Sequence, residues 1–238
     1  MSNNRLIKEI YQLVPVAPTA EYGVEIEMEG QHLVTPLKGW IRHDDGSLRG
    51  QCAEWIFDKP VSKNLTLRRV KRLYEFNLTS GATLNPSARC GVHVHMNVQE
   101  LTQQQVINLV LLYYVLENVL VKWCDNSREC NPFCLRLSEA DYQTELLLQF
   151  NSNFDYAVRQ WSKYASLNLN CIRSFGSVEF RCLETPKTHE KICLWIELLD
   201  KLKEKALSID TVLGYIQILK KVSYRQIVDF FSCCGQSS

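Results

Sequence analysis

Three short segments of the sequence alternate between apolar side chains and side chains that carry charge or an imidazole. They are GVEIEME (23–29), GVHVHMN (91–97) and SVEFRC (177–182). Successive side chains of a β-strand point to opposite faces, so each segment predicts a strand with one apolar and one polar face. The polar faces would carry Glu25, Glu27, Glu29, His93, His95, Asn97, Glu179 and Arg181.

These residue types indicate a site for a cation and a phosphate. The polar face of a solvated strand usually carries Thr, Ser, Lys and Gln, whereas these faces carry Glu, His and Arg and no Lys. If the strands share one sheet, carboxylates at close range are unfavourable unless a cation lies between them. Magnesium prefers carboxylate oxygen and keeps phosphates as ligands, imidazole suits a mixed site, and the guanidinium fork of Arg pairs with phosphate oxygens. A solvated face of an antiparallel sheet is the alternative for any one strand alone.

The segments around these strands predict an α+β fold, with a mostly antiparallel sheet whose charged concave face is backed by helices on the other side. Residues 43–50 (HDDGSLRG) have the chemistry of a turn, and residues 52–57 (CAEWIF) are a further strand candidate that places Glu54 between Ala53 and Trp55. Residues 167–184 predict a β-hairpin with its turn near Phe175–Ser177.

Apolar residues at helical spacing predict the helices. The segments are about 64–78, about 102–123 with Thr102 as N-cap, a more polar stretch over 139–164, 189–207, 210–221 and 224–231. No internal repeat or linker divides the chain. We therefore expect one domain over residues 1–238, with a motif-bearing core at about 20–200 and a helical C-terminal extension at about 205–234.

Composition limits the partners. The chain of 238 residues carries 27 Lys and Arg against 26 Asp and Glu, a net charge of +1, so no basic excess indicates nucleic acid or an acidic membrane surface. The start, MSNNRLIKEI, lacks the apolar core of a signal peptide, and the longest apolar run, Leu109 to Leu116, is far shorter than the roughly 20 residues that span a bilayer. We expect a cytoplasmic protein that is neither secreted nor embedded in a membrane.

The ten cysteines show no regular spacing and are expected to be reduced thiols, many of them buried. Cys124, Cys130 and Cys134 are close enough in sequence to suggest a zinc site. However, their spacing of C-x5-C-x3-C is not common among zinc sites, and no His lies nearby. Buried structural thiols are the preferred interpretation.

The order of the motifs resembles that of the amidoligase family. The motifs are GVEIEME, DGSL followed by AEW, CGVHVHMN, YASLNLN and GSVEFRCLET. That family belongs to the carboxylate–amine ligases with a glutamine-synthetase-like fold and is common in phages and bacteria. The resemblance covers roughly residues 20–200. Residues 124–134 resemble the family's segment after the long helix only loosely, and Arg128 matches an arginine of that segment.

The resemblance implies ATP-dependent formation of an amide bond through an acyl phosphate, and it assigns roles to individual residues. The residues expected to hold two or three Mg²⁺ ions, or Mn²⁺, are Glu25, Glu27, Glu54, His95 and Glu179. Those expected to contact ATP are Arg181, His93, Glu179 and Asn168. Arg181 would stabilise the transferring phosphoryl group, His93 would be a second phosphate or metal contact, and Asp45 would bind the amine or take its proton.

Two other functions remain open on the sequence. The same cluster could activate water in a metal-dependent hydrolase, or the chain could be a binding protein that has lost turnover. The intact Glu-x-Glu, His-x-His and Glu-x-Arg pairs favour an active enzyme. The sequence does not choose among small-molecule, peptide or modified-base substrates, and the oligomeric state stays open.

Overall fold

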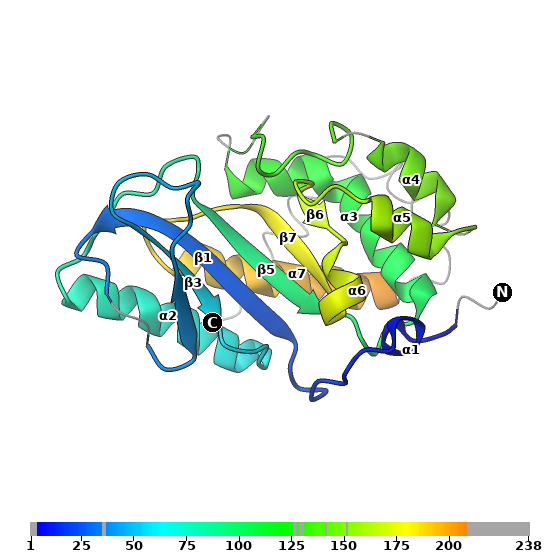
Figure 1. Cartoon of the computed structure of the whole chain (residues 1–238), viewed down its shortest axis with the longest axis horizontal. Helices are drawn as coiled ribbons and strands as arrows, with labels where there is room; N and C mark the ends of the chain where they lie inside the picture. Colours follow the sequence, from blue (N-terminus) through cyan, green and yellow to red (C-terminus); the bar gives the residue numbers. More distant parts are fainter. Residues whose placement is uncertain are drawn as a thin grey trace.

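The computed structural model describes residues 4–34, 37–125, 128, 131–140, 142–150 and 152–208. Within these residues, seven strands form one sheet in which all paired strands are antiparallel (Figure 1). The order across the sheet is β2 (Trp40–His43), β3 (Cys52–Phe57), β1 (Tyr22–Gln31), β5 (Gly91–Asn97), β7 (Ser177–Glu184) and β6 (Leu167–Asn168). The short β4 (Thr83–Leu84) pairs with the end of β1. The expected α+β class and open antiparallel sheet are confirmed.

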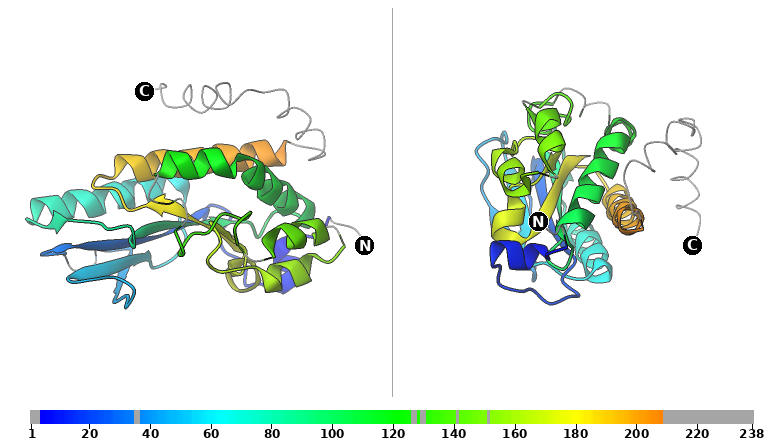
Figure 2. Two further views of the ribbon diagram at one scale, coloured as in Figure 1. Left: turned by 90° about the horizontal axis from the view of Figure 1, so that it is seen from above. Right: turned by 90° about the vertical axis from the view of Figure 1, so that its right-hand side faces the viewer.

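The apolar faces of the central strands form the core of the protein. Ile26 of β1, Val94 of β5 and Phe180 of β7 are completely buried. Three helices cover this face and contact one another and the sheet: α2 (Lys63–Thr79), α3 (Gln103–Cys124) and α7 (Glu190–Leu207) (Figure 2). They match three of the predicted helices. The opposite face of the sheet, which carries the charged side chains, is therefore the one available for chemistry.

Helix α3 begins where the sequence predicts, because the side chain of Thr102 accepts a hydrogen bond from the backbone N–H of Gln105. By length and hydropathy α3 is apolar enough to cross a membrane. In the structure most of it is buried against the sheet and α7, as expected of the central helix of a core. This packing accounts for its apolar character.

The stretch predicted to be helical over 139–164 contains two short helices. These are α4 (Gln143–Gln149) and α5 (Phe154–Gln160), which lie beyond β6 (Figure 1). The second helix starts anew at Asn153, whose side chain accepts a hydrogen bond from the N–H of Tyr156. Asn at such a position caps a helix more readily than it continues one. The predicted segments 210–221 and 224–231 lie outside the described residues.

The predicted hairpin over 167–184 is half correct. Strands β6 and β7 pair as expected, but the short helix α6 (Cys171–Phe175) joins them in place of a tight turn. Helix α6 ends at Gly176, which has a φ of +67° and a close neighbour: a Cβ there would lie 2.3 Å from Cγ of Gln99. The other short helix, α1 (Ile7–Tyr11), contacts α6.

A β-bulge interrupts the pairing of β5 with β7. Val92 pairs with Leu183 and Val94 with Phe180, so one residue of β5, His93, lies opposite two residues of β7. These two residues are Arg181 and Cys182. Arg181 lies on the polar face and the buried Cys182 in the core, as the alternation of a strand requires. The bulge occurs next to the charged side chains, as bulges near functional sites often do.

Candidate functional site

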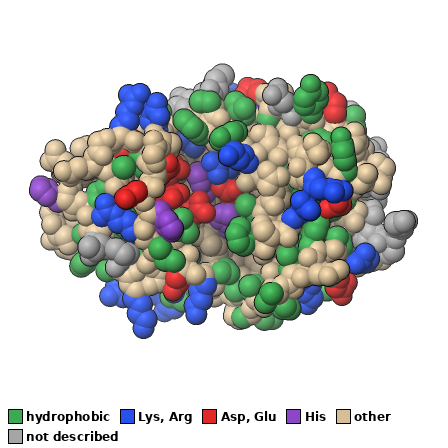
Figure 3. All heavy atoms as spheres, viewed as in Figure 1, with side chains coloured by type: hydrophobic (Ala, Val, Ile, Leu, Met, Phe, Trp, Pro, Cys, Tyr) green, Lys and Arg blue, Asp and Glu red, His purple; other side chains and the backbone are tan. Residues whose placement is uncertain are grey.

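The strand register brings the charged residues into one row across the sheet. Glu54 pairs with Glu27, Glu25 with His93, and His95 with Glu179. In the space-filling view, carboxylate and imidazole side chains gather at the centre of the face opposite the three long helices (Figure 3). Residues that are far apart in the sequence thus form one cluster.

His93 lies at the centre of this cluster and is only 4% exposed. Its Nδ1 lies 3.1 Å from Oε2 of Glu25 and 3.4 Å from Oε1 of Glu179, and its Nε2 lies 3.8 Å from Oε1 of Glu27. Nη1 of Arg181 also lies 3.4 Å from this Nδ1, so His93 contacts three carboxylates and a guanidinium.

Glu25 lies between the two imidazoles. Its carboxylate contacts His93 through Oε2 and Nε2 of His95 through Oε1, the latter at 3.2 Å. Burial would raise the pKa of Glu25, but the hydrogen bonds with the two histidines outweigh it and lower that pKa well below its ordinary value. Burial likewise opposes the charge on His95, but contacts with Cys171, Glu25 and Glu179 raise the pKa of His95 to about 10.

A second group of acids is formed by Glu27, Asp45 and Glu54, whose oxygens lie within 4.8 Å of one another. Burial, together with Glu25, Glu27 and Asp45, raises the pKa of Glu54 to about 7, and burial raises the pKa of Glu27. Asp45 lies in the turn after β2, and Ser47 donates to it from its backbone N–H and from its hydroxyl, each at 2.8 Å. Three carboxyl groups this close together repel one another when they are ionised. A divalent cation bound between them would offset this repulsion.

Glu179 connects the cluster to a guanidinium and an amide. Its Oε1 accepts a hydrogen bond from Arg181 and its Oε2 accepts one from Nδ2 of Asn168 at 2.6 Å. Burial would raise the pKa of Glu179, but His93, Arg181 and His95 together lower it. Arg181 also donates to the carbonyl of Phe133 at 3.4 Å. Asn168 in turn accepts from the N–H of Asn170 at 2.9 Å, so its amide is held in one orientation.

Two residues without a predicted role form hydrogen bonds that hold the cluster or its strands in place. Gly91 donates its N–H to Oε2 of Glu27 at 2.7 Å, and a Cβ at this position would lie 3.1 Å from Nε2 of His93. Arg128 is 1% exposed, and it donates to the carbonyl oxygens of Arg181 at 2.9 Å and Cys182 at 3.2 Å. The loosely matched arginine thus binds the backbone of the bulge.

A cavity of about 360 Å³ opens beside the cluster. Glu25 and His95 line it, together with Phe57, Phe175 and Lys59 among others. It is mostly apolar, so it offers room for an organic group next to the charged residues.

The structure brings all nine predicted site residues to this face, in the row or at its ends: Glu25, Glu27, Asp45, Glu54, His93, His95, Asn168, Glu179 and Arg181. Glu29 instead accepts a hydrogen bond from the N–H of Arg49 at 2.9 Å.

Sequence reasoning missed Cys171, whose sulfur lies within 4.8 Å of ligand atoms of His95 and Glu179. It lies in the unpredicted helix α6, outside any strand pattern that could have marked it. In the group considered for zinc, Cys124 contacts the sulfur of Cys182 at 3.5 Å, Cys134 contacts the carbonyl of Arg128, and Cys130 lies outside the described residues. Both described thiols are buried.

The comparisons with known proteins agree with the motif series. A search of curated proteins finds no match to the chain. A family model described as "putative amidoligase enzyme" matches residues 63–203, more than half of the chain. The matched part contains β5, β6 and β7 with their site residues, and β1 to β3 precede it. The chain therefore belongs to this amidoligase family.

Proposed function

We propose that the protein is an ATP-dependent ligase that joins a carboxylate to an amine through an acyl phosphate. The observation that carries this proposal is the row of carboxylates and imidazoles across the sheet, next to a guanidinium held by the bulge. Family membership supports amide formation at a coarse level. The arrangement of charge supports phosphoryl transfer as the means of activating the carboxylate.

The donor set fits Mg²⁺ or Mn²⁺. The groups Glu27–Asp45–Glu54 and Glu25–His93–Glu179 each offer three ligand atoms within 4.8 Å of one another, and five of these six residues are carboxylates. When bound there, two or three such ions would neutralise the charge of the ATP phosphates. We propose Glu25, Glu27, Glu54 and Glu179 as ligands of these ions, with His95 at the edge of the second group, where its Nε2 lies 3.2 Å from Oε1 of Glu25. His93, a member of the second group, offers a further ligand atom.

Arg181 is proposed to bind the phosphoryl group during its transfer. The oxygen of the substrate carboxylate attacks the γ-phosphorus of ATP, and ADP leaves with the electrons of the broken bond. Charge then develops on the equatorial oxygens, which a preorganised guanidinium stabilises. Glu179 and the carbonyl of Phe133 hold Arg181 in place before the reaction, and Asn168 orients Glu179.

Asp45 is proposed to bind the amine. The nitrogen attacks the carbonyl carbon of the acyl phosphate and phosphate leaves, so the nitrogen must lose a proton. Asp45 accepts hydrogen bonds from Ser47 and retains lone pairs for a further donor, and it lies beside Glu27 and Glu54 at the edge of the cluster. A carboxyl group at this position would accept a hydrogen bond from the amine and take the proton that the nitrogen releases.

The cavity beside Glu25 and His95 is proposed to take the organic part of the carboxylate substrate, with Lys59 on its wall to attract negative charge. Small-molecule, peptide and modified-base carboxylates all meet this description. The cytoplasm supplies both ATP and Mg²⁺, and we propose that the protein acts there.

Isothermal titration of ATP in the presence of Mg²⁺ tests the proposal. We expect magnesium-dependent binding to the wild type and none to Glu179→Gln. The matched control is Glu184→Gln, because Glu184 lies at the far end of β7, where it faces Lys191 at 3.9 Å. Release of ADP that requires both a carboxylate and an amine would then identify a ligase. Absence of nucleotide binding at saturating Mg²⁺ would overturn the proposal and leave a hydrolase or an inactive binding protein.

A further inference from the structure

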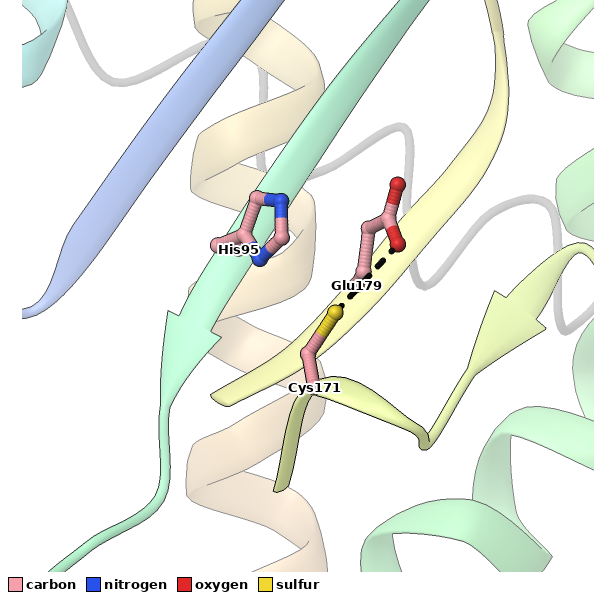
Figure 4. Close-up of side chains that lie close together, drawn as sticks. All are labelled: His95, Cys171 and Glu179. Atoms are coloured by element: carbon pink, nitrogen blue, oxygen red, sulfur yellow. Dashed lines mark hydrogen bonds between the residues drawn. The ribbon is translucent and has the colours of Figure 1, made fainter. Parts of the chain in front are cut away.

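A third group of ligand atoms lies at the edge of the cluster and differs chemically from the other two. His95 of β5, Cys171 of α6 and Glu179 of β7 point toward one another from three separate elements (Figure 4). Their nitrogen, sulfur and oxygen atoms lie within 4.8 Å of one another. The thiol of Cys171 donates to Oε2 of Glu179 at 3.6 Å. A soft ligand thus joins an imidazole and a carboxylate.

The carboxylate of Glu179 faces two directions. Its Oε1 is directed to His93 and Arg181, whereas its Oε2 is directed to Cys171 and Asn168. Each oxygen therefore belongs to a different group of potential ligands. A carboxylate with this arrangement can bridge two cations, as in sites with two metal ions.

The ligand types of this third group do not suit magnesium. Mg²⁺ requires oxygen ligands in a nearly octahedral arrangement, whereas Zn²⁺ is commonly bound by thiolate, imidazole and carboxylate together. Three protein ligands leave a fourth position of a tetrahedral zinc site open. His95 also lines the cavity of about 360 Å³, so this edge of the cluster adjoins the space for an organic group.

The sulfur of Cys171 lies next to a carboxylate and an imidazole, the two partners with which it would share a cation. It contacts Oε2 of Glu179 at 3.6 Å, and Glu25 lies on the other side of His95. The amide of Asn168 donates weakly to the sulfur at 3.7 Å. A divalent cation binds the thiolate form of cysteine, so any proton of the Cys171 thiol leaves to solvent when the cation binds, and no electrons are exchanged.

We propose that His95, Cys171 and Glu179 bind a thiophilic divalent cation of the Zn²⁺ class, next to the positions assigned to magnesium. The bridging role of Glu179 rests on the proposed function; the binding of the thiophilic cation does not. The site would then hold two chemically different kinds of metal ion, with Glu179 between them.

Binding of Co²⁺ to the whole protein gives the first test, because a thiolate ligand produces an intense charge-transfer absorption in the near ultraviolet. We expect this absorption in the wild type, its loss in Cys171→Ser, and its retention in Cys193→Ser. Cys193 is a matched control because it is also a partly exposed free thiol but lies on α7, on the other side of the sheet. Retention of the absorption in Cys171→Ser would overturn the proposal.

X-ray absorption of the zinc-loaded wild type gives a second test that needs no variant. We expect one sulfur neighbour at about 2.3 Å together with nitrogen or oxygen neighbours at about 2.0–2.1 Å. A first shell without sulfur would overturn the proposal. If ATP does not bind in magnesium but the sulfur neighbour is present, the ligase proposal fails and the thiophilic site stands. If ATP binds in magnesium but no sulfur neighbour is found, the ligase proposal stands and the thiophilic site is overturned.

Discussion

Replacing Arg128 with Met tests how strongly one buried guanidinium stabilises the bulge. Arg128 donates to the carbonyl oxygens of Arg181 and Cys182 at 2.9 and 3.2 Å, where the pairing of β5 with β7 is interrupted. Further contacts with the carbonyls of Ala88 and Cys90, at 3.4 and 3.5 Å, are weaker. Met occupies a similar space but donates no hydrogen bond, so the two carbonyls at the bulge lose this donor.

The expected loss of stability follows from these two carbonyls. A buried polar group left without a partner costs about 1–3 kcal/mol, so the free energy of unfolding should fall by about 2–6 kcal/mol. In a chain of this length each kcal/mol lowers the Tm by about 2–4 °C. We therefore expect Arg128→Met to lower the Tm on the order of 10 °C.

Thermal and urea unfolding, followed by circular dichroism, would measure this loss. Arg159→Met is the control, because Arg159 pairs with Asp155 at 2.7 Å on the surface and its side chain is 49% exposed. Such a pair contributes about 0–1 kcal/mol. If Arg128→Met lowers the Tm no more than the control does, the bulge does not depend on Arg128 and the reasoning is refuted.

Three further changes test other parts of the cluster and the core. Gly91→Ala places a Cβ 3.1 Å from Nε2 of His93 and 3.2 Å from Nη2 of Arg128, and we expect urea unfolding to show a loss of about 1–3 kcal/mol; unchanged stability would mean that this space is not restricted. Burial raises the pKa of Glu117 from 4.5 to about 7, so the folded state binds this proton more tightly and stability falls as the pH rises through this range. Between pH 5 and 8 the wild type should lose roughly 2 kcal/mol more than Glu117→Gln, and parallel pH profiles of the two proteins would contradict the assignment. Free Mn²⁺ at a hundredfold excess over its Kd should raise the free energy of unfolding by about 2.7 kcal/mol. This corresponds to a rise in Tm of about 5–10 °C in the wild type, with a smaller rise in Glu27→Gln. Equal shifts in both proteins would exclude Glu27 as a ligand.

The polar faces of the strands could be predicted because a strand repeats every two residues. Glu25 and Glu27 are separated by one apolar residue, and that spacing alone assigns both to the same face. The neighbours across the sheet could not be predicted in the same way. Alternation does not say that Glu25 contacts both His93 and His95, because this depends on strand order and register.

Two residues of the site lie where periodicity gives no guide to their role. Arg128 matches a family arginine only loosely, and its contacts with the backbone depend on a bulge in the pairing of distant strands. Cys171 begins a helix of five residues between β6 and β7, a length at which helical spacing gives no signal. The stretch predicted to be helical over 139–164 forms two separate helices, because the side chain of Asn153 caps the second one.

The position of β5 between β1 and β7 has a consequence for folding during synthesis. β1, β3 and β5 all leave the ribosome before β7, which follows β5 by about eighty residues. Until β7 docks, the nascent sheet has an open edge at β5, and Glu25, Glu27 and Glu54 lie side by side without Arg181. Docking of β7 closes that edge and supplies the missing positive charge in one step. Because this contact joins residues at least 80 positions apart in the sequence, we expect it to limit the folding rate. We also expect a chain that stops before residue 177 to associate through the exposed edge of β5.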